Sequence, residues 1–317
     1  MDHRKLIKFG TSSYVISIPT SWIKKNNLEK GDTVYLDEKA NGELTIVSND
    51  NINDKEDSVK NIAVENRENN ELQRLISTAY INNYRIINIV GVDLYKKSKF
   101  IKEILGNLVA VEIIEQSSQK IVAKDFLDNK TISIENTVKK IDMIIRSIFK
   151  DSTLTFQINN FEDIYQRDED VNKLTFLLFK IIKSTLNNPQ LHKKLNVNNE
   201  QLMSYWQLGD NLEKIADEIK RIARIIAKKE LKEIEKTDFL ELYSKVEAYY
   251  LKSMKLYYAK DGDNAIKLTN HKSNYAGLLN EYLEEHNRKE VLILIERLRI
   301  MTGYIHNISR IIYEIHN

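Results

Sequence analysis

The sequence predicts an α+β multidomain protein with a small β-rich N-terminal domain, a small α/β module and a mainly helical bundle. Its 317 residues are enough for two or three domains of roughly 100–200 residues each. Only 2 Pro and 9 Gly occur, so long helices can cover most of the chain. Hydrophobic residues make up 42% and charged residues 30%, which is typical of a chain that buries a core.

Residues 1–48 are predicted to fold in the order β-β-α-β-β. Two short β-prone runs at 6–9 and 14–18 are followed by Pro19, which cannot donate to a sheet and ends the second strand. A short helix capped by Thr20 or Ser21 comes next. A last hairpin joins runs at 33–36 and 43–47 through an Asn-Gly turn at 41–42. A unit this small buries little core alone, so we expect it to dimerise.

Residues 49–68 are rich in Asn, Asp, Glu and Lys and are predicted to form a linker. Residues 69–130 have the pattern of an α/β module. A helix is expected around 72–79, a buried strand at 84–92 and a second helix around 100–105. Two more strands, 109–114 and 120–126, are expected to pair.

Residues 131–317 are predicted to be helical almost throughout, with six helices at about 133–151, 160–187, 199–230, 237–259, 262–286 and 289–316. In the third helix, apolar residues between Leu212 and Ile226 recur at steps of three and one, which is an amphipathic stripe. Asn188-Pro189 and Asp261-Gly262-Asp263 separate neighbouring helices. The pattern predicts one bundle or two packed three-helix bundles.

Composition excludes several classes of protein and site. The net charge is 48 − 46 = +2, which argues against a polyanion binder along the whole chain but allows a local basic patch. There is no cysteine, so disulfides, zinc–thiolate sites, iron–sulfur clusters and a Cys nucleophile are excluded. No signal peptide or membrane span is visible. We therefore expect a soluble cytoplasmic protein without membrane insertion.

The N-terminal domain separates its charges along the sequence. Residues 3–25 contain no acidic residue, and their basic residues are Arg4, Lys5, Lys8, Lys24 and Lys25. With the hydroxyls of Thr11, Ser12 and Ser13, these side chains can contact DNA phosphates or bases, and a dimer would present two such patches. The alternative interpretation is an ordinary solvated face.

Residues 3–32 contain a recognisable pattern. It consists of the early basic residues, the loop at Gly10, the strand ending in Ile18-Pro19, the short basic helix and the Leu-x-x-Gly-Asp segment at 28–32. It resembles the swapped-hairpin DNA-binding domain of the AbrB/SpoVT/MazE type. The resemblance implies an interlocked homodimer that binds double-stranded DNA through its first strand, loop and helix. The loop departs from the family, since it has Thr11-Ser12-Ser13 where a basic or Gly-Arg loop is common.

Oxygen-bearing side chains gather on two of the expected helices, at Asp168, Asn172, Asp210, Glu213 and Asp217. The last three fall within about 60° of one another on a helical wheel. If the two helices lie side by side, these side chains could bind a hard cation such as Mg²⁺ or Ca²⁺, or iron or manganese. The alternative is a solvated face on which Asp217 pairs with Arg221.

The segments 164–174 and 211–223 are similar to the two acidic helices of the PhoU family. The resemblance extends over about 133–317 and implies two three-helix repeats, a divalent or iron-type metal ion on the acidic motifs and no organic cofactor. In the second repeat Arg299 and Gly303 stand at the carboxylate positions, so at most one intact site is implied. His271 and His306 are interpreted as ordinary polar residues between helices.

No enzyme is expected. The chain has no Glu-x-x-His motif, no phosphate-binding loop and no G-x-S-x-G elbow. The combination resembles archaeal phosphate uptake regulators, in which a swapped-hairpin domain is fused to a PhoU-like bundle. This implies a DNA-binding transcriptional regulator of phosphate homeostasis. The alternative is an adaptor that acts on a phosphate transporter ATPase or a signalling kinase and uses its N-terminal domain only to dimerise.

Overall fold

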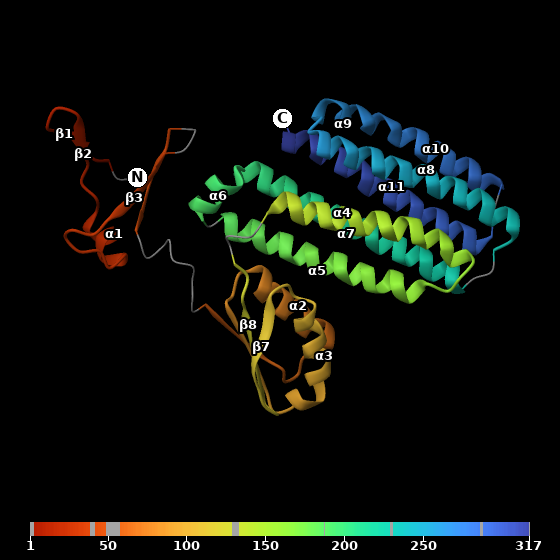
Figure 1. The fold of residues 1–317 in the computed structure, drawn as a ribbon, viewed down its shortest axis with the longest axis horizontal. Helices are drawn as coiled ribbons and strands as arrows, with labels where there is room; N and C mark the ends of the chain where they lie inside the picture. The colour runs from red at the N-terminus through yellow and green to blue at the C-terminus, as the bar shows by residue number, and fades with distance from the viewer. Residues whose placement is uncertain are drawn as a thin grey trace. The chain divides into compact units, whose positions relative to one another are not determined.

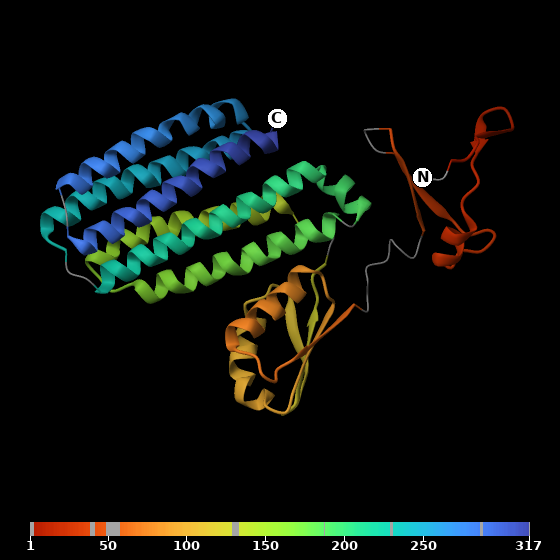
Figure 2. The ribbon, with the colours of Figure 1, turned by 180° about the vertical axis from the view of Figure 1, so that it is seen from behind.

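The computed structural model describes residues 3–38, 42–48, 58–128, 133–186, 188–228, 231–285 and 288–316. The chain divides into two compact units, Met1–Glu56 and Asp57–Asn317. It has the predicted α+β multidomain architecture, with small N-terminal hairpins, a small sheet module and a long helical region (Figures 1 and 2). None of the helices in the described ranges is long and apolar enough to cross a membrane.

The first unit follows the expected β-β-α-β-β order: β1 Ile7–Phe9, β2 Ser13–Val15, α1 Thr20–Lys25, β3 Val34–Glu38 and β4 Leu44–Ser48. β1 and β2 form an antiparallel hairpin whose turn contains Gly10 at φ +72°, a conformation that glycine adopts without steric cost. β3 and β4 form the second hairpin, with Val34 opposite Ser48. The Asn41 half of the expected turn lies outside the described residues.

The described residues of the first unit form no apolar core of their own. Among its described residues only Ser48 is buried, and it is polar. Large apolar side chains in this described part of the chain are exposed, including Leu6 at 70% and Phe9 at 69%. The unit therefore lacks the buried apolar surface that stabilises an isolated domain.

The second unit begins with a four-stranded sheet in the order β5-β6-β8-β7. Its strands and helices are β5 Val59–Ala63, α2 Asn69–Ile81, β6 Ile86–Val90, α3 Leu94–Gly106, β7 Val111–Gln116 and β8 Lys120–Asp125. β5 and β6 are parallel, and the other neighbours are antiparallel. Both α2 and α3 cover one face of the sheet (Figures 1 and 2), and an apolar cluster fills the space between them.

The structure corrects one prediction here. Part of the expected linker, 49–68, is the edge strand β5, which pairs in register with β6 from Val59 opposite Ile86 to Ala63 opposite Val90. Only Ile62 of this strand is buried. The strand is thus stabilised by its backbone hydrogen bonds to β6 more than by burial of apolar side chains. Its polar composition therefore gives no sign of a strand in the sequence. Residues 49–57 lie outside the described ranges.

Most described residues of the helical region belong to two successive sets of helices. The first set is α4 Ile134–Ser152, α5 Phe161–Leu186 and α7 Asn199–Lys228. The second is α8 Glu233–Ala259, the shorter α9 Gly262–Leu268 and α10 Lys272–Glu285 in succession, and α11 Lys289–His316. One continuous apolar core runs through both sets. All seven stripe residues of α7 between Leu212 and Ile226 are buried in it.

Two details differ from the sequence prediction. The expected helix 262–286 is interrupted by a 3₁₀ turn at Thr269–His271, where the Thr269 hydroxyl donates to the Ile266 carbonyl, a local bond that competes with regular helix. Pro189 does not only separate two helices but starts a short one, α6 Pro189–Leu195. The side chain of Asn188 caps it by accepting from Gln190 N and Leu191 N.

Candidate functional site

The expected DNA-binding residues lie on two exposed elements of the first unit. Lys8 is in β1, Ser13 begins β2, and Thr11 and Ser12 are in the turn between them. The remaining basic residues are Arg4 and Lys5, just before β1, and Lys24 and Lys25, in the last turn of α1. All eight side chains are exposed. Within this unit the structure therefore presents two basic elements, the hairpin and α1, to solvent.

Backbone hydrogen bonds open the first turn of α1, and positive charges suit its last turn. The carbonyl of Pro19 accepts the backbone N–H groups of Trp22 and Ile23, which opens the first turn. Lys24 and Lys25 lie at the C-terminal end, where the helix dipole favours positive charge. The helix therefore holds two adjacent lysines in an ordered, solvent-facing position, as phosphate contacts need.

The carboxylates expected to bind a metal lie on α5 and α7, which pack side by side. Asp168 on α5 is almost fully buried, with 1% of its side chain exposed. Its Oδ2 is 2.5 Å from Nζ of Lys220 on α7. The same ammonium is 2.9 Å from Oδ1 of Asp217, whose Oδ2 is 2.5 Å from Arg221. The structure therefore brings Asp168 and Asp217 together, with a lysine between them.

The other three expected ligands are placed differently. Asp210 pairs with Lys214 at 2.6 Å near the surface. Asn172, one turn along α5 from Asp168, is half-buried. Glu213 is half-buried with no hydrogen bond among the described residues. Burial and the negative charges of Asp217, Asp168 and Asp210 raise the pKa of Glu213 to about 7.

Sequence reasoning missed Lys220, which is central to this cluster. Burial lowers the pKa of its ammonium, but its hydrogen bonds to Asp168 and Asp217 outweigh that effect, so that the pKa is raised. The signal was present in the sequence, since Lys220 follows Asp217 by three residues and so shares its helix face. Within the described ranges, no three or more His, Cys, Asp or Glu side chains are arranged to hold a metal ion.

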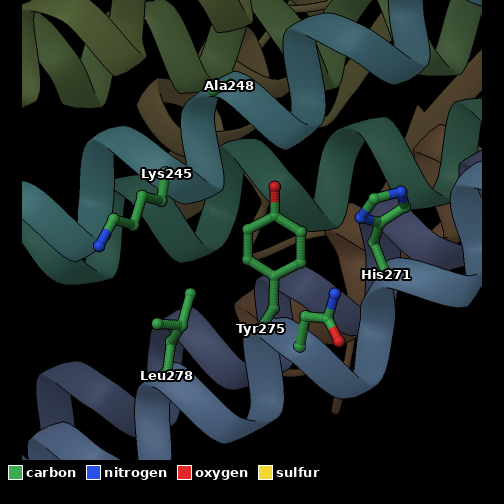
Figure 3. A pocket seen from close by; sticks show the side chains of 6 residues that line it. Lys245, Ala248, His271, Tyr275 and Leu278 are labelled. Carbon is green, nitrogen blue, oxygen red and sulfur yellow. The ribbon is translucent and has the colours of Figure 1, made fainter.

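Among the residues that the structure describes, the second set of helices carries no acidic cluster at the equivalent place. Arg299 donates to Asn280 at 2.8 Å, and Gly303 lies inside α11. His271 lines a shallow groove of about 280 Å³ between α8 and α10, with Lys245, Ala248, Asn274, Tyr275 and Leu278. Figure 3 shows the Tyr275 ring standing between the two helices, with Leu278 on one side and His271, from the preceding 3₁₀ turn, on the other. The Tyr275 ring stacks on the buried Tyr249 ring, with 4.6 Å between the ring centres, so this lining residue is held by aromatic packing.

The α/β module packs against α5, the helix that carries Asp168. Lys180 of α5 is buried, 2.9 Å from Asp125 at the end of β8, and donates to the Tyr80 carbonyl. Nearer the cluster, Asn107 at the end of α3 donates to Glu169, the neighbour of Asp168. One helix is therefore in contact with the carboxylate cluster on one side and with the module on another.

Two segments of the chain match known protein families. Residues 7–53 match the family model described as antidote-toxin recognition MazE, bacterial antitoxin. Residues 135–226, which span α4, α5 and α7, match the model of the PhoU domain. Searches of curated proteins and of solved structures gave no match. A MazE-type domain indicates DNA binding and dimerisation, and a PhoU domain indicates a role in phosphate homeostasis.

Proposed function

This chain joins an N-terminal MazE-type domain to a PhoU domain, and from that premise we propose that it is a dimeric, DNA-binding transcriptional regulator of phosphate uptake. The first unit binds double-stranded DNA. The helical region receives the signal of phosphate status. Such a regulator acts in the cytoplasm and carries out no chemical reaction of its own.

The observation that carries this proposal is the coreless first unit. Its strands expose apolar side chains such as Leu6, Phe9 and Tyr14, at 70%, 69% and 65%. Leaving this surface in water is costly, at about 25 cal/mol per Å² of apolar area. A second copy of the same unit would cover it by interleaving strands, because each copy presents the same unfilled surface. We therefore propose a homodimer through this unit.

Dimerisation would also place the basic residues of two copies in one DNA-binding surface. Each copy exposes Lys8 on its hairpin and Lys24 and Lys25 on α1, so a dimer doubles these charges around a two-fold axis. Lysine contacts to phosphates supply affinity and register, and the symmetry suits a two-fold operator. The hydroxyls of Thr11 to Ser13, in the exposed turn, are placed for further contacts to phosphates or bases.

The contacts of α5 support a route from the helical region to the α/β module. Lys180 of α5 contacts Asp125 of the module, and Asn107 of the module contacts Glu169 of α5. A partner that binds the helical region, such as a phosphate transporter ATPase or a signalling kinase, can regulate DNA binding only if it favours one of two states of the protein. We propose that α5 belongs to the element that differs between those states.

Fluorescence anisotropy with labelled DNA tests the proposal. The full-length protein is titrated onto DNA from upstream of phosphate-transport genes and onto a shuffled duplex, at several salt concentrations. We expect tighter binding to the upstream DNA and a linear fall of log affinity with log salt. Equal binding to both duplexes without salt dependence would refute DNA recognition.

Charge reversal locates the contact. Lys24→Glu with Lys25→Glu removes four lysines from the dimer, so the salt slope should fall by about 3–4, since each phosphate contact contributes about 0.9. The matched control is Lys139→Glu with Lys140→Glu, an adjacent exposed pair on α4. If both double variants bind DNA like the wild type, the first unit serves only for dimerisation and the adaptor alternative is favoured.

A further inference from the structure

We propose that the ammonium of Lys220 is the resident cation of the carboxylate cluster between α5 and α7 and takes the place of a metal ion there. This inference concerns the PhoU domain alone and is independent of DNA binding by the first unit. It departs from the sequence-based hypothesis that the same carboxylates bind a metal ion.

The position of Lys220 is that of a shared counter-ion. Its Nζ lies within 2.9 Å of carboxylate oxygens from two helices, Asp168 of α5 and Asp217 of α7. Only 12% of the lysine side chain is exposed, and only 1% of Asp168. The ammonium also lies 5.8 Å from the centre of the Tyr165 ring, which adds a favourable cation–π contact. A buried carboxylate needs such a partner, and here the partner belongs to the chain itself.

Two more carboxylate oxygens of the cluster are also engaged by basic side chains. Arg221 takes the second oxygen of Asp217, and Lys214 takes Asp210. A divalent ion bound between Asp168 and Asp217 would lie within a few ångströms of the Lys220 ammonium and would be repelled by it. The ion would also have to replace hydrogen bonds that are already formed. The donor set is thus chemically suited to a hard cation but is sterically and electrostatically occupied.

Removing the Lys220 ammonium should make the carboxylates available to a metal ion. Without its ammonium, Asp168 and Asp217 present free oxygens from adjacent helices, with Glu213 one turn from Asp217 on α7. Three carboxylates are a ligand set that Mn²⁺ or Mg²⁺ can use. The variant Lys220→Met, which replaces the aliphatic part of the side chain but not its charged end, should therefore gain a metal site.

The test measures Mn²⁺ content and thermal unfolding of the full-length protein. After dialysis against MnCl₂ and removal of free ion, wild type should hold no stoichiometric Mn²⁺, and its Tm should be the same in Mn²⁺ and in EDTA. Lys220→Met in EDTA should unfold about 5–10 °C lower, because an unpaired carboxylate is left buried. It should then bind about one Mn²⁺ and regain at least half of the lost Tm.

Lys214→Met is the matched control, since that lysine of α7 also pairs with an aspartate of the same helix, Asp210, but is 44% exposed. It should change neither Tm nor Mn²⁺ content. If Lys220→Met does not fold, Lys220→Gln is measured in its place. The proposal is overturned if wild type retains about one Mn²⁺ per chain, or if the Lys220 variant binds no more Mn²⁺ than wild type.

Discussion

Glu213 should make the protein less stable as pH rises, and Glu213→Gln should remove that loss. The carboxyl group is half-buried on α7 and has no hydrogen-bonding partner among the described residues. Asp168, Asp210 and Asp217 surround it with negative charge. A neutral amide of nearly the same shape avoids both burial of a charge and repulsion from its neighbours. The substitution is therefore expected to stabilise the protein at alkaline pH.

The sign and size of this change in stability follow from the pKa of Glu213, which burial and the neighbouring carboxylates raise from 4.5 to about 7. Between these two values the folded protein keeps a proton that the unfolded chain has lost, so stability falls as pH rises through the window. A pKa rise of one is worth about 1.4 kcal/mol, which gives about 3 kcal/mol in full. Solvent screening of a half-buried group reduces this to about 1–2 kcal/mol.

Urea unfolding of wild type and Glu213→Gln at pH 5 and pH 8 measures the effect. At pH 8 the variant should be more stable by about 1–2 kcal/mol, and at pH 5 most of this difference should disappear. Asp210→Asn is the control, because Asp210 is 43% exposed and paired with Lys214, so its effect should be small at both pH values. A variant that is less stable than wild type at pH 8, or equally shifted at both pH values, would refute the reasoning.

Three further outcomes are expected. Phe9→Glu, at a side chain 69% exposed in the single chain, should convert the proposed dimer to a monomer in light scattering without lowering the Tm of the helical region. Lys180→Met should cost about 3–5 kcal/mol in urea unfolding because it leaves Asp125 buried without its partner, and adding Asp125→Asn should restore part of the loss. Gly209→Ala should cost about 1–3 kcal/mol, because its Cβ would lie 2.7 Å from Leu178 Cδ2; an unchanged Tm would contradict this contact.

Strong local patterns predicted most of the fold. The apolar stripe of α7 is long enough that its period alone identifies a buried helix face, and its residues are all buried. The edge strand β5 was missed for the opposite reason. It has five residues and a single buried side chain, Ile62, and its pairing with β6 joins segments separated in sequence by all of α2. A short polar strand has no local signal that distinguishes it from a linker.

The carboxylate site shows a different limit. Helical spacing placed Asp210, Glu213 and Asp217 on one face of α7, and the structure agrees that Asp168 of α5 lies close to Asp217. Spacing also allowed the Asp217–Arg221 ion pair, which is formed. Helical spacing alone does not show whether a bound metal cation or a basic side chain neutralises these carboxylates. That depends on whether Lys220 reaches across to the neighbouring helix.

The sequence by itself determined the order of domains, the long helices, the two basic elements of the first unit and the candidate carboxylates, because each follows from residue type and local period. Tertiary structure decided which charges meet. Lys220 joins Asp168 across 52 positions of sequence, and Lys180 joins Asp125 across the boundary between helix and sheet. Such pairs depend on burial and helix packing, since only a partner brought close in a dry environment makes a buried charge stable.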